Sequence, residues 1–198
     1  MRDEQNILEV AGLHPEMMGF IFYPESKRFV GDEFHIPEIS SDIKKVGVFV
    51  NEEPEKVVQI LKKHQLQTAQ LHGSETPEIC SLIGTNGFKV LKAFGIDENF
   101  EWSILEHYIP VTDGFVFDTK TIQHGGSGKK FNWNMLENYT LTHPFLLSGG
   151  IKAEDADKLL NFEHPQCLGF DVNSGFEIQP AYKDVTLLKS FITKIREK

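Results

Sequence analysis

The sequence predicts an α/β fold in which a parallel β-sheet is built from repeated strand and helix units. Short apolar runs recur along the chain, they are apolar throughout as strands buried on both faces should be, and amphipathic segments separate them. No linker or low-complexity tract interrupts the series, so we expect one domain over residues 1–198 with right-handed parallel connections. The seven runs cover residues 18–22, 45–50, 68–72, 89–94, 114–118, 145–148 and 168–172.

The chain begins with a predicted helix rather than with a strand. Asp3 is placed to cap a helix over residues 4–11, in which Ile7, Leu8 and Ala11 form an apolar face. A parallel barrel of eight strands closes on itself, whereas seven strands leave two unpaired edges. The order of elements is therefore that of a barrel from which one strand has been removed at the front.

The later helices are marked by their first residues and by their apolar faces. Pro54 opens one helix, and Thr76 followed by Pro77 predicts an N-cap with proline in the first turn of another. Near the C-terminus, residues 185–195 place apolar side chains on one helical face. These helices fall between the predicted strands, as the repeating pattern requires.

Composition limits the class of protein. A chain of 198 residues with 40% hydrophobic content suits one well-buried domain. The apolar runs are too short to span a bilayer, and the charged N-terminus lacks the apolar stretch of a signal peptide. The formal net charge of −9 argues against nucleic acid or an anionic membrane as a partner, because either requires a basic face. Cys80 and Cys167 are isolated in the sequence, so we expect a cytoplasmic protein without a disulfide.

Two strand ends that carry glycines predict a phosphate site near the C-terminus. Residues 147–151 (Leu-Ser-Gly-Gly-Ile) and 169–175 (Gly-Phe-Asp-Val-Asn-Ser-Gly) each end an apolar run. Glycine allows the backbone to turn sharply and to bring N–H groups up to an anion. In a (β/α)8 barrel, the loops after the last two strands are where a substrate phosphate binds. Either segment alone reads as an ordinary turn, but together, at the end of the series, they favour a phosphorylated small molecule as the ligand.

Several motifs in combination resemble those of the phosphoribosylanthranilate isomerase family. The resemblance covers essentially the whole chain, because the motifs occur in family order and at family spacing. It implies a (β/α)8 TIM barrel, here without its first strand. It also implies conversion of N-(5′-phosphoribosyl)anthranilate into 1-(2-carboxyphenylamino)-1-deoxyribulose 5-phosphate in tryptophan biosynthesis, with no metal or organic cofactor. The motifs are residues 18–30, 46–51, 70–73, 117–119, 125–129, 147–151 and 170–175.

The reaction implied by the resemblance requires an acid at the sugar. Opening the ribose ring needs a proton on the ring oxygen, which a carboxylic acid can supply if burial raises its pKa toward neutrality. Asp118 ends the run over residues 114–117 and matches the family's general acid. Without the resemblance, an aspartate at this point reads as a turn or N-cap residue.

The family's general base has no counterpart in the sequence. In the family, a cysteine at the end of the first strand takes the C2′ proton, in a lysine-rich Cys-Gly segment just before the position of Met1. Cys80 falls in a helix-like segment and Cys167 at the start of the last strand, so neither replaces that cysteine. We expect the chain as written to be catalytically impaired and less stable than a longer protein that includes the missing strand.

Two interpretations of the missing base are open. Either Met1 is an internal methionine of a longer natural protein, or the chain is a variant that binds the ligand without completing the reaction. We favour the first, because loss of a barrel strand exposes the edges of its two neighbours.

The resemblance and the chemistry assign the remaining contacts. Arg28 matches the arginine that faces the anthranilate carboxylate, where a planar fork can bind two oxygens. His72 ends a strand and is expected at the mouth of the barrel, as a substrate contact or as a structural residue. The side chain of Asp171 is expected to order its loop, since a carboxylate repels phosphate. The phosphate is expected on the N–H groups of Gly149, Gly150, Asp171 and Asn173, with Ser174 nearby.

Residues 125–129 (Gly-Gly-Ser-Gly-Lys) are rich in glycine but do not form a Walker motif. No glycine lies four intervening residues before Gly128, and Lys130 stands where serine or threonine is required. A loop that closes over the active site fits better, and it would bring His124 and Lys129 near the substrate.

Two other functions are compatible with the phosphate cradle, the predicted phosphate site formed by residues 147–151 and 169–175. One is a different sugar-phosphate isomerase or epimerase, although the histidines do not fall at the strand ends where a metal would need them. The other is a barrel that binds a phosphorylated ligand without turnover. A monomer or a homodimer is compatible with each of these functions.

Overall fold

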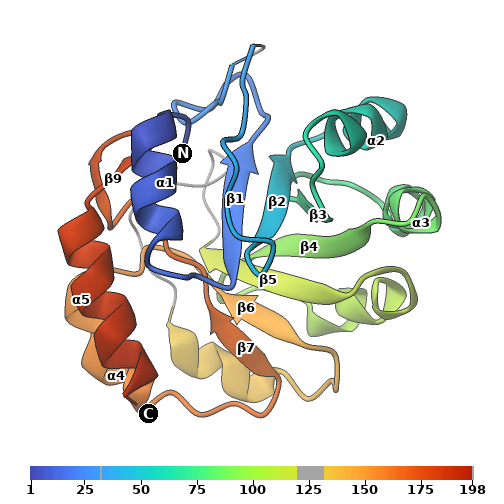
Figure 1. Cartoon of the computed structure of the whole chain (residues 1–198). Coiled ribbons are helices and arrows are strands. Elements are labelled where there is room, and N and C mark those ends of the chain that lie inside the picture. Colours follow the sequence, from blue (N-terminus) through green and yellow to red (C-terminus); the bar gives the residue numbers. More distant parts are fainter. Residues whose placement is uncertain (32, 120–131, 198) are drawn as a thin grey trace.

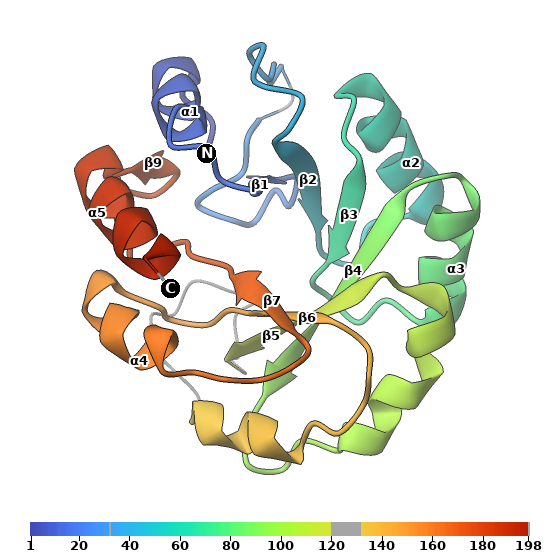
Figure 2. The same ribbon diagram turned by 60° about the horizontal axis from the view of Figure 1, so that its bottom comes forward.

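The centre of the structure is a parallel sheet of seven strands whose order in space follows the sequence. In this computed structural model, residues 1–31, 33–119 and 132–197 are described. Every neighbouring pair of strands is parallel, and the sheet curls with helices outside it (Figure 1 and Figure 2). The strands are β1 (Met17–Ile21), β2 (Lys44–Phe49), β3 (Thr68–Leu71), β4 (Lys89–Ile96), β5 (Gly114–Thr119), β6 (Phe145–Leu147) and β7 (Cys167–Phe170). The predicted parallel α/β fold is confirmed, with each strand boundary within two residues of its predicted position.

Four of the five described α-helices begin where the sequence predicts, and the exception, α4, was not predicted. At the start of α1, the Asp3 carboxylate accepts a hydrogen bond of 2.8 Å from the N–H of Asn6. Thr76 occupies the N-cap position of α3 and Pro77 its first turn, as predicted, although the Thr76 side chain makes no capping hydrogen bond. Among the described residues, no helix has both the length and the apolar character needed to cross a membrane. The α-helices are α1 (Glu4–Ala11), α2 (Pro54–Lys63), α3 (Pro77–Thr85), α4 (Ala156–Leu160) and α5 (Val185–Arg196).

The two faces of the sheet bury different side chains. Leu91, Ala93 and Val116 form a small cluster on one face, and the partly buried Leu146 packs against it. The alternate residues of the same strands, such as Phe115, belong to the large cluster that contains the apolar faces of the helices. Because side chains alternate across a strand, the small cluster fills the inside of the curled sheet and the large one lies between the sheet and its helices.

The sheet has two free edges. Strands β1 and β7 stand at its two ends, and among the described residues no strand pairs with the outer edge of either (Figure 2). Leu168 of β7 is accordingly 67% exposed. The two edges predicted from seven strands are therefore present in the described part of the chain.

Several elements were not predicted. A hairpin of β8 (Glu177–Gln179) and β9 (Tyr182–Lys183) stands between β7 and α5, and it is joined to α1 by two hydrogen bonds between Asn6 and the backbone of Lys183. Short 3-10 helices replace full α-helices next to β5 and β6, namely η1 (Trp102–His107), η2 (Ile109–Val111) and η3 (Trp133–Asn138), and a fourth, η4 (Ala153–Asp155), leads into α4.

Candidate functional site

All eight predicted site residues line one cavity of about 1130 Å³. They follow the carboxyl ends of the parallel strands, the edge at which barrel enzymes place their active sites. The cavity exceeds an ordinary ligand pocket of about 300–1,000 Å³. It is this large because it continues between the unpaired edges, where Met17 and Leu168 line it. The eight residues are Arg28, His72, Asp118, Gly149, Gly150, Asp171, Asn173 and Ser174.

Asp118 and His72 form a hydrogen-bonded pair inside this cavity. Oδ2 of Asp118 lies 3.2 Å from Nε2 of His72, and Oδ1 accepts a hydrogen bond of 2.7 Å from the N–H of Thr119. On the other side of the imidazole, Nε2 of Gln70 lies 3.1 Å from Nδ1. An amide nitrogen can only donate, so Nδ1 is the acceptor and the proton of the neutral ring is on Nε2, where it is donated to Asp118.

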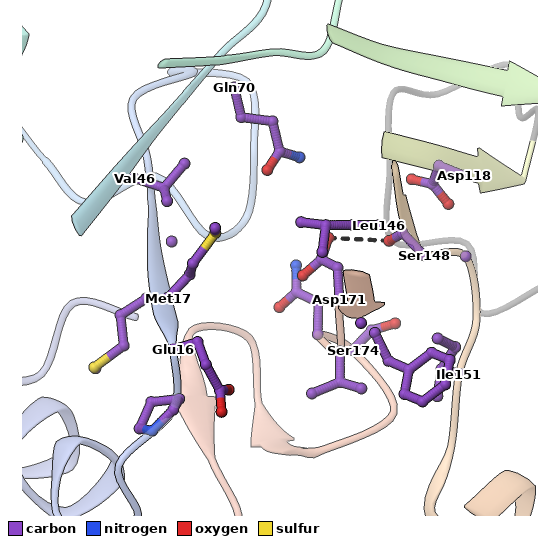
Figure 3. A pocket seen from close by; sticks show the side chains of 18 of the residues that line it. Glu16, Met17, Val46, Gln70, Asp118, Leu146, Ser148, Ile151, Asp171 and Ser174 are labelled. Carbon is purple, nitrogen blue, oxygen red and sulfur yellow. Dashed lines mark hydrogen bonds between the residues drawn. The ribbon is translucent and has the colours of Figure 1, made fainter. Parts of the chain in front are cut away.

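Sequence reasoning missed Gln70. A signal was present, because Gln70 and His72 are two residues apart at the end of one strand and such residues point to the same side of a sheet. Figure 3 shows the amide of Gln70 directed into the cavity.

Asp171 directs its carboxyl group toward the same space. Its Oδ2 accepts a hydrogen bond of 3.0 Å from the hydroxyl of Ser148 (Figure 3). Burial raises the pKa of Asp171, and the nearby charge of Asp118 adds to this, whereas the Ser148 hydrogen bond and the charge of Lys183 oppose it. The N–H of Asp171 donates to the carbonyl of Leu147 at 2.8 Å. This N–H belongs to the sheet, so the geometry does not support its predicted role as a phosphate donor.

The two predicted cradle loops meet closely. Gly149 and Gly150 have φ angles of +91° and +67°, a backbone region that favours glycine. A Cβ atom on Gly149 would lie 2.9 Å from Oδ1 of Asp118, and one on Gly175 would collide with the carbonyl oxygen of Ile151. Among the described residues, no acceptor receives the N–H groups of Gly149, Gly150, Asn173 or Ser174. These four groups are therefore suited to hold an anion.

Arg28 lines the cavity with its guanidinium already engaged. It forms an ion pair of 2.7 Å with Glu177, in which the side chains are 14% and 4% exposed. Lys183 pairs with the same carboxylate at 3.0 Å. Sequence reasoning missed Glu177 and Lys183, because both belong to the hairpin that it did not predict.

The two cysteines occupy the positions that the sequence predicts. Cys80 is buried within α3, where burial raises the pKa of its thiol to about 11. Cys167 is the first residue of β7, at the opposite end of the sheet from Asp118. Among the described residues, no group of three histidine, cysteine or carboxylate side chains could hold a metal ion. Residues 125–129 and His124 lie outside the described residues.

Comparisons with known proteins agree with one another. The family model for N-(5′-phosphoribosyl)anthranilate isomerase matches residues 1–194. The isomerase of that name from Parabacteroides distasonis is 44% identical over 200 residues, covering 98% of this chain and 90% of the relative. The crystal structure of phosphoribosyl anthranilate isomerase from Thermotoga maritima is similar with a TM-score of 0.83 and 31% identity, covering 100% of this chain and 96% of the other. A further crystal structure has a TM-score of 0.80, 28% identity and the same coverage; it shows a phosphoribosyl anthranilate isomerase in complex with reduced 1-(o-carboxyphenylamino)-1-deoxyribulose 5-phosphate.

Proposed function

This chain belongs to the N-(5′-phosphoribosyl)anthranilate isomerase family, and we propose that the cavity described above is the site where the isomerisation takes place. The family's reaction belongs to tryptophan biosynthesis and converts an aminoaldose phosphate into its ketose isomer. The observation that carries the proposal is the convergence of an acid, an arginine and a loop pair rich in free N–H groups on one cavity.

The phosphate of the substrate is placed at the cradle formed by the loops after β6 and β7. The N–H groups of Gly149, Gly150, Asn173 and Ser174 supply donors there, and backbone donors bind an anion without burying a second charge. Asp171 is not among these donors, since its N–H donates to the carbonyl of Leu147 within the sheet.

The carboxylate of the anthranilate ring is placed at Arg28. Nε and Nη2 of Arg28 are bound to Glu177, which fixes the plane of the guanidinium at the wall of the cavity. The remaining N–H groups of the fork are then available for the substrate carboxylate.

Asp118 is placed at the sugar as the general acid that protonates the ring oxygen. Its carboxyl group lies between the cradle residue Gly149 and the imidazole of His72. The Nε2–H of His72 donates to Asp118 and orients its carboxyl group. A general acid in this position contributes about 10²–10⁴ to the rate.

A second candidate function, ligand binding without turnover, is favoured by one specific observation. Removal of the C2′ proton needs a base, and neither described cysteine lies near Asp118. Cys80 is buried in α3, and Cys167 lies at the far end of β7.

Conversion and binding, measured on the same protein, separate the two functions. Substrate and product are separated by chromatography, and binding of the reduced product analogue is measured by calorimetry. We expect the chain to bind the analogue and to convert the substrate slowly, because neither cysteine lies where it could take the C2′ proton. Asp118→Asn should still bind the analogue but lose the remaining conversion by a factor of about 10² or more. The exposed Asp42→Asn serves as a control and should behave as the parent. Binding without conversion in the parent supports the second function, and absence of binding refutes both.

A further inference from the structure

We propose that Glu177 is a positioning residue that couples the two ends of the substrate site, because it holds Arg28 at the carboxylate end and Lys183 at the phosphate end. The inference rests on the function proposed above and adds two residues to it. Neither residue is expected to touch the substrate's reacting atoms.

The contact with Arg28 is a fork against a carboxylate. Nε of Arg28 donates to both carboxylate oxygens of Glu177, at 3.0 and 2.9 Å, and Nη2 donates to Oε2 at 2.7 Å. Both side chains are largely buried. This geometry holds the guanidinium in one plane, which a single-point contact would not do.

The contact with Lys183 continues the network into the cradle. The ammonium group of Lys183 donates to Oε1 of Glu177 at 3.0 Å, and to the backbone carbonyl of Asn173 at 3.0 Å and its side-chain oxygen at 2.5 Å. All three of its donors are thereby used. Lys183 therefore fixes the loop that carries Asn173, and its own backbone is fixed by Asn6 of α1.

The carboxylate of Glu177 compensates the charges of both Arg28 and Lys183. Burial alone would raise the pKa of Glu177, but the hydrogen bond from Arg28 and the charge of Lys183 outweigh it and lower the pKa, so the carboxylate is ionised. Arg28 and Lys183 are therefore two largely buried cations that share one carboxylate. Without the carboxylate, two buried cations would repel each other, and both would move.

The arrangement predicts a different result for each member of the network. Lys183→Met should loosen the cradle and weaken phosphate binding only. Arg28→Met should weaken carboxylate binding only. Glu177→Gln, which keeps the shape of the side chain and removes its charge, should weaken both.

The experiment measures binding of three probes to the full chain by NMR titration. The probes are inorganic phosphate, anthranilate, and the reduced product analogue that carries both groups. For Glu177→Gln we expect weaker binding of both small probes and a loss of about tenfold or more for the analogue. The control is Glu25→Gln, because Glu25 is exposed and, within the described part of the chain, its side chain bonds to the hydroxyl of Tyr23 alone.

The outcomes separate the coupling from a purely structural role. Unchanged affinities with a lower melting temperature in Glu177→Gln would show that the network serves the fold alone and would overturn the proposal. Loss of anthranilate binding alone would also overturn it, since Glu177 would then serve only Arg28. If the parent chain binds phosphate and anthranilate separately but not the analogue, the proposed function fails, while the two small probes still decide the role of Glu177. A parent chain that binds none of the probes would refute both.

Discussion

The imidazole Nε2 of His72 lies 3.2 Å from Oδ2 of Asp118, so the proposed general acid is hydrogen-bonded to a histidine from a neighbouring strand end. The direction of this bond is set from the far side of the ring, where Gln70 donates to Nδ1. A neutral imidazole with its proton on Nε2 orients Asp118 without placing a full positive charge beside it. That matters for an acid, because a cation next to a carboxyl group lowers its pKa and removes the proton that it must donate.

Replacing Gln70 by glutamate should turn Nδ1 of His72 from a hydrogen-bond acceptor into a donor. A carboxylate beside Nδ1 favours a proton on that nitrogen, so His72 carries a proton on both ring nitrogens. The positive charge then favours the ionised form of Asp118, which slows conversion. Imidazole NMR titrations measure the first effect, and a pH series of conversion rates measures the second. Gln179→Glu, at an exposed position, is the matched control. An unchanged His72 titration in Gln70→Glu would show that Gln70 does not control the ring.

Gly149→Ala should displace the side chain of Asp118 as well as strain the local backbone. Gly149 and Gly87 have nearly the same φ, +91° and +90°, but a Cβ on Gly149 would crowd Thr119 and Asp118 whereas one on Gly87 would meet no atom within 4 Å. Gly87→Ala therefore measures the backbone cost alone, about 1–2 kcal/mol. We expect Gly149→Ala to lower the free energy of unfolding by more than this and to reduce conversion, while Gly87→Ala leaves conversion unchanged. Equal losses of stability would mean that the loop relaxes around the added methyl group.

The free energy of unfolding of Asp171→Asn should exceed that of the parent by an amount that grows as pH rises. Burial raises the pKa of Asp171 above the ordinary value of 3.8, so the native state holds this proton more tightly than the unfolded chain does. The parent therefore loses stability as pH rises from the unfolded pKa through the folded one, and asparagine, which does not ionise, avoids that loss. The two proteins should have similar stabilities well below pH 3.8 and differ most above the folded pKa.

Urea unfolding at a series of pH values tests this prediction. The contrasting variant is Asp155→Asn, because the buried Asp155 accepts a hydrogen bond of 2.7 Å from the N–H of Lys152 and should lose stability on substitution. A pH-independent difference between Asp171→Asn and the parent would contradict the proposed cause.

The strands and the residues at their ends could be predicted because each is a local property of the sequence. A run such as residues 114–118 is apolar throughout, and the polar residue that ends it must lie at the carboxyl edge of a parallel sheet. All eight predicted residues line one cavity for this reason. Their contacts with one another were not predictable at this level, as Asp171 shows: whether its N–H is free depends on its pairing with Leu147 of the neighbouring strand.

The residues that sequence reasoning missed depend on long-range contacts. Glu177 is 149 positions from Arg28, and nothing in the sequence around either residue indicates that they meet. The hairpin that carries Glu177 and Lys183 is short, its strands being Glu177–Gln179 and Tyr182–Lys183, and too few residues alternate there to give a strand pattern. Local propensity does not predict such an element, because it is held by contacts with distant residues, namely the ion pair with Arg28 and the hydrogen bonds with Asn6.

A buried ion pair next to the loop of His72 predicts that two lysines of the same strand, Lys92 and Lys89, contribute very differently to stability. The side chains of Lys92 and Glu75 are 3% and 1% exposed, and their charged atoms lie 3.2 Å apart. Lys92 also donates to the carbonyls of Leu71, Gly73 and Ala93, and Glu75 accepts from the N–H of Gly73, so the pair fixes the segment on both sides of His72.

Lys92→Met should therefore lower the free energy of unfolding by about 3–5 kcal/mol, because it leaves the Glu75 charge buried without its partner. Lys89→Met is the matched control on the same strand: its ion pair with Asp113 is exposed, and such a pair adds little to stability. Chemical denaturation of both variants measures the difference. If Lys92→Met were as mild as Lys89→Met, then Glu75 would have taken up a proton or reached solvent, and the loop of His72 would not depend on the pair. A double variant, Lys92→Met with Glu75→Gln, decides between these cases, since removing both charges should recover part of the loss only if the uncompensated carboxylate is its cause.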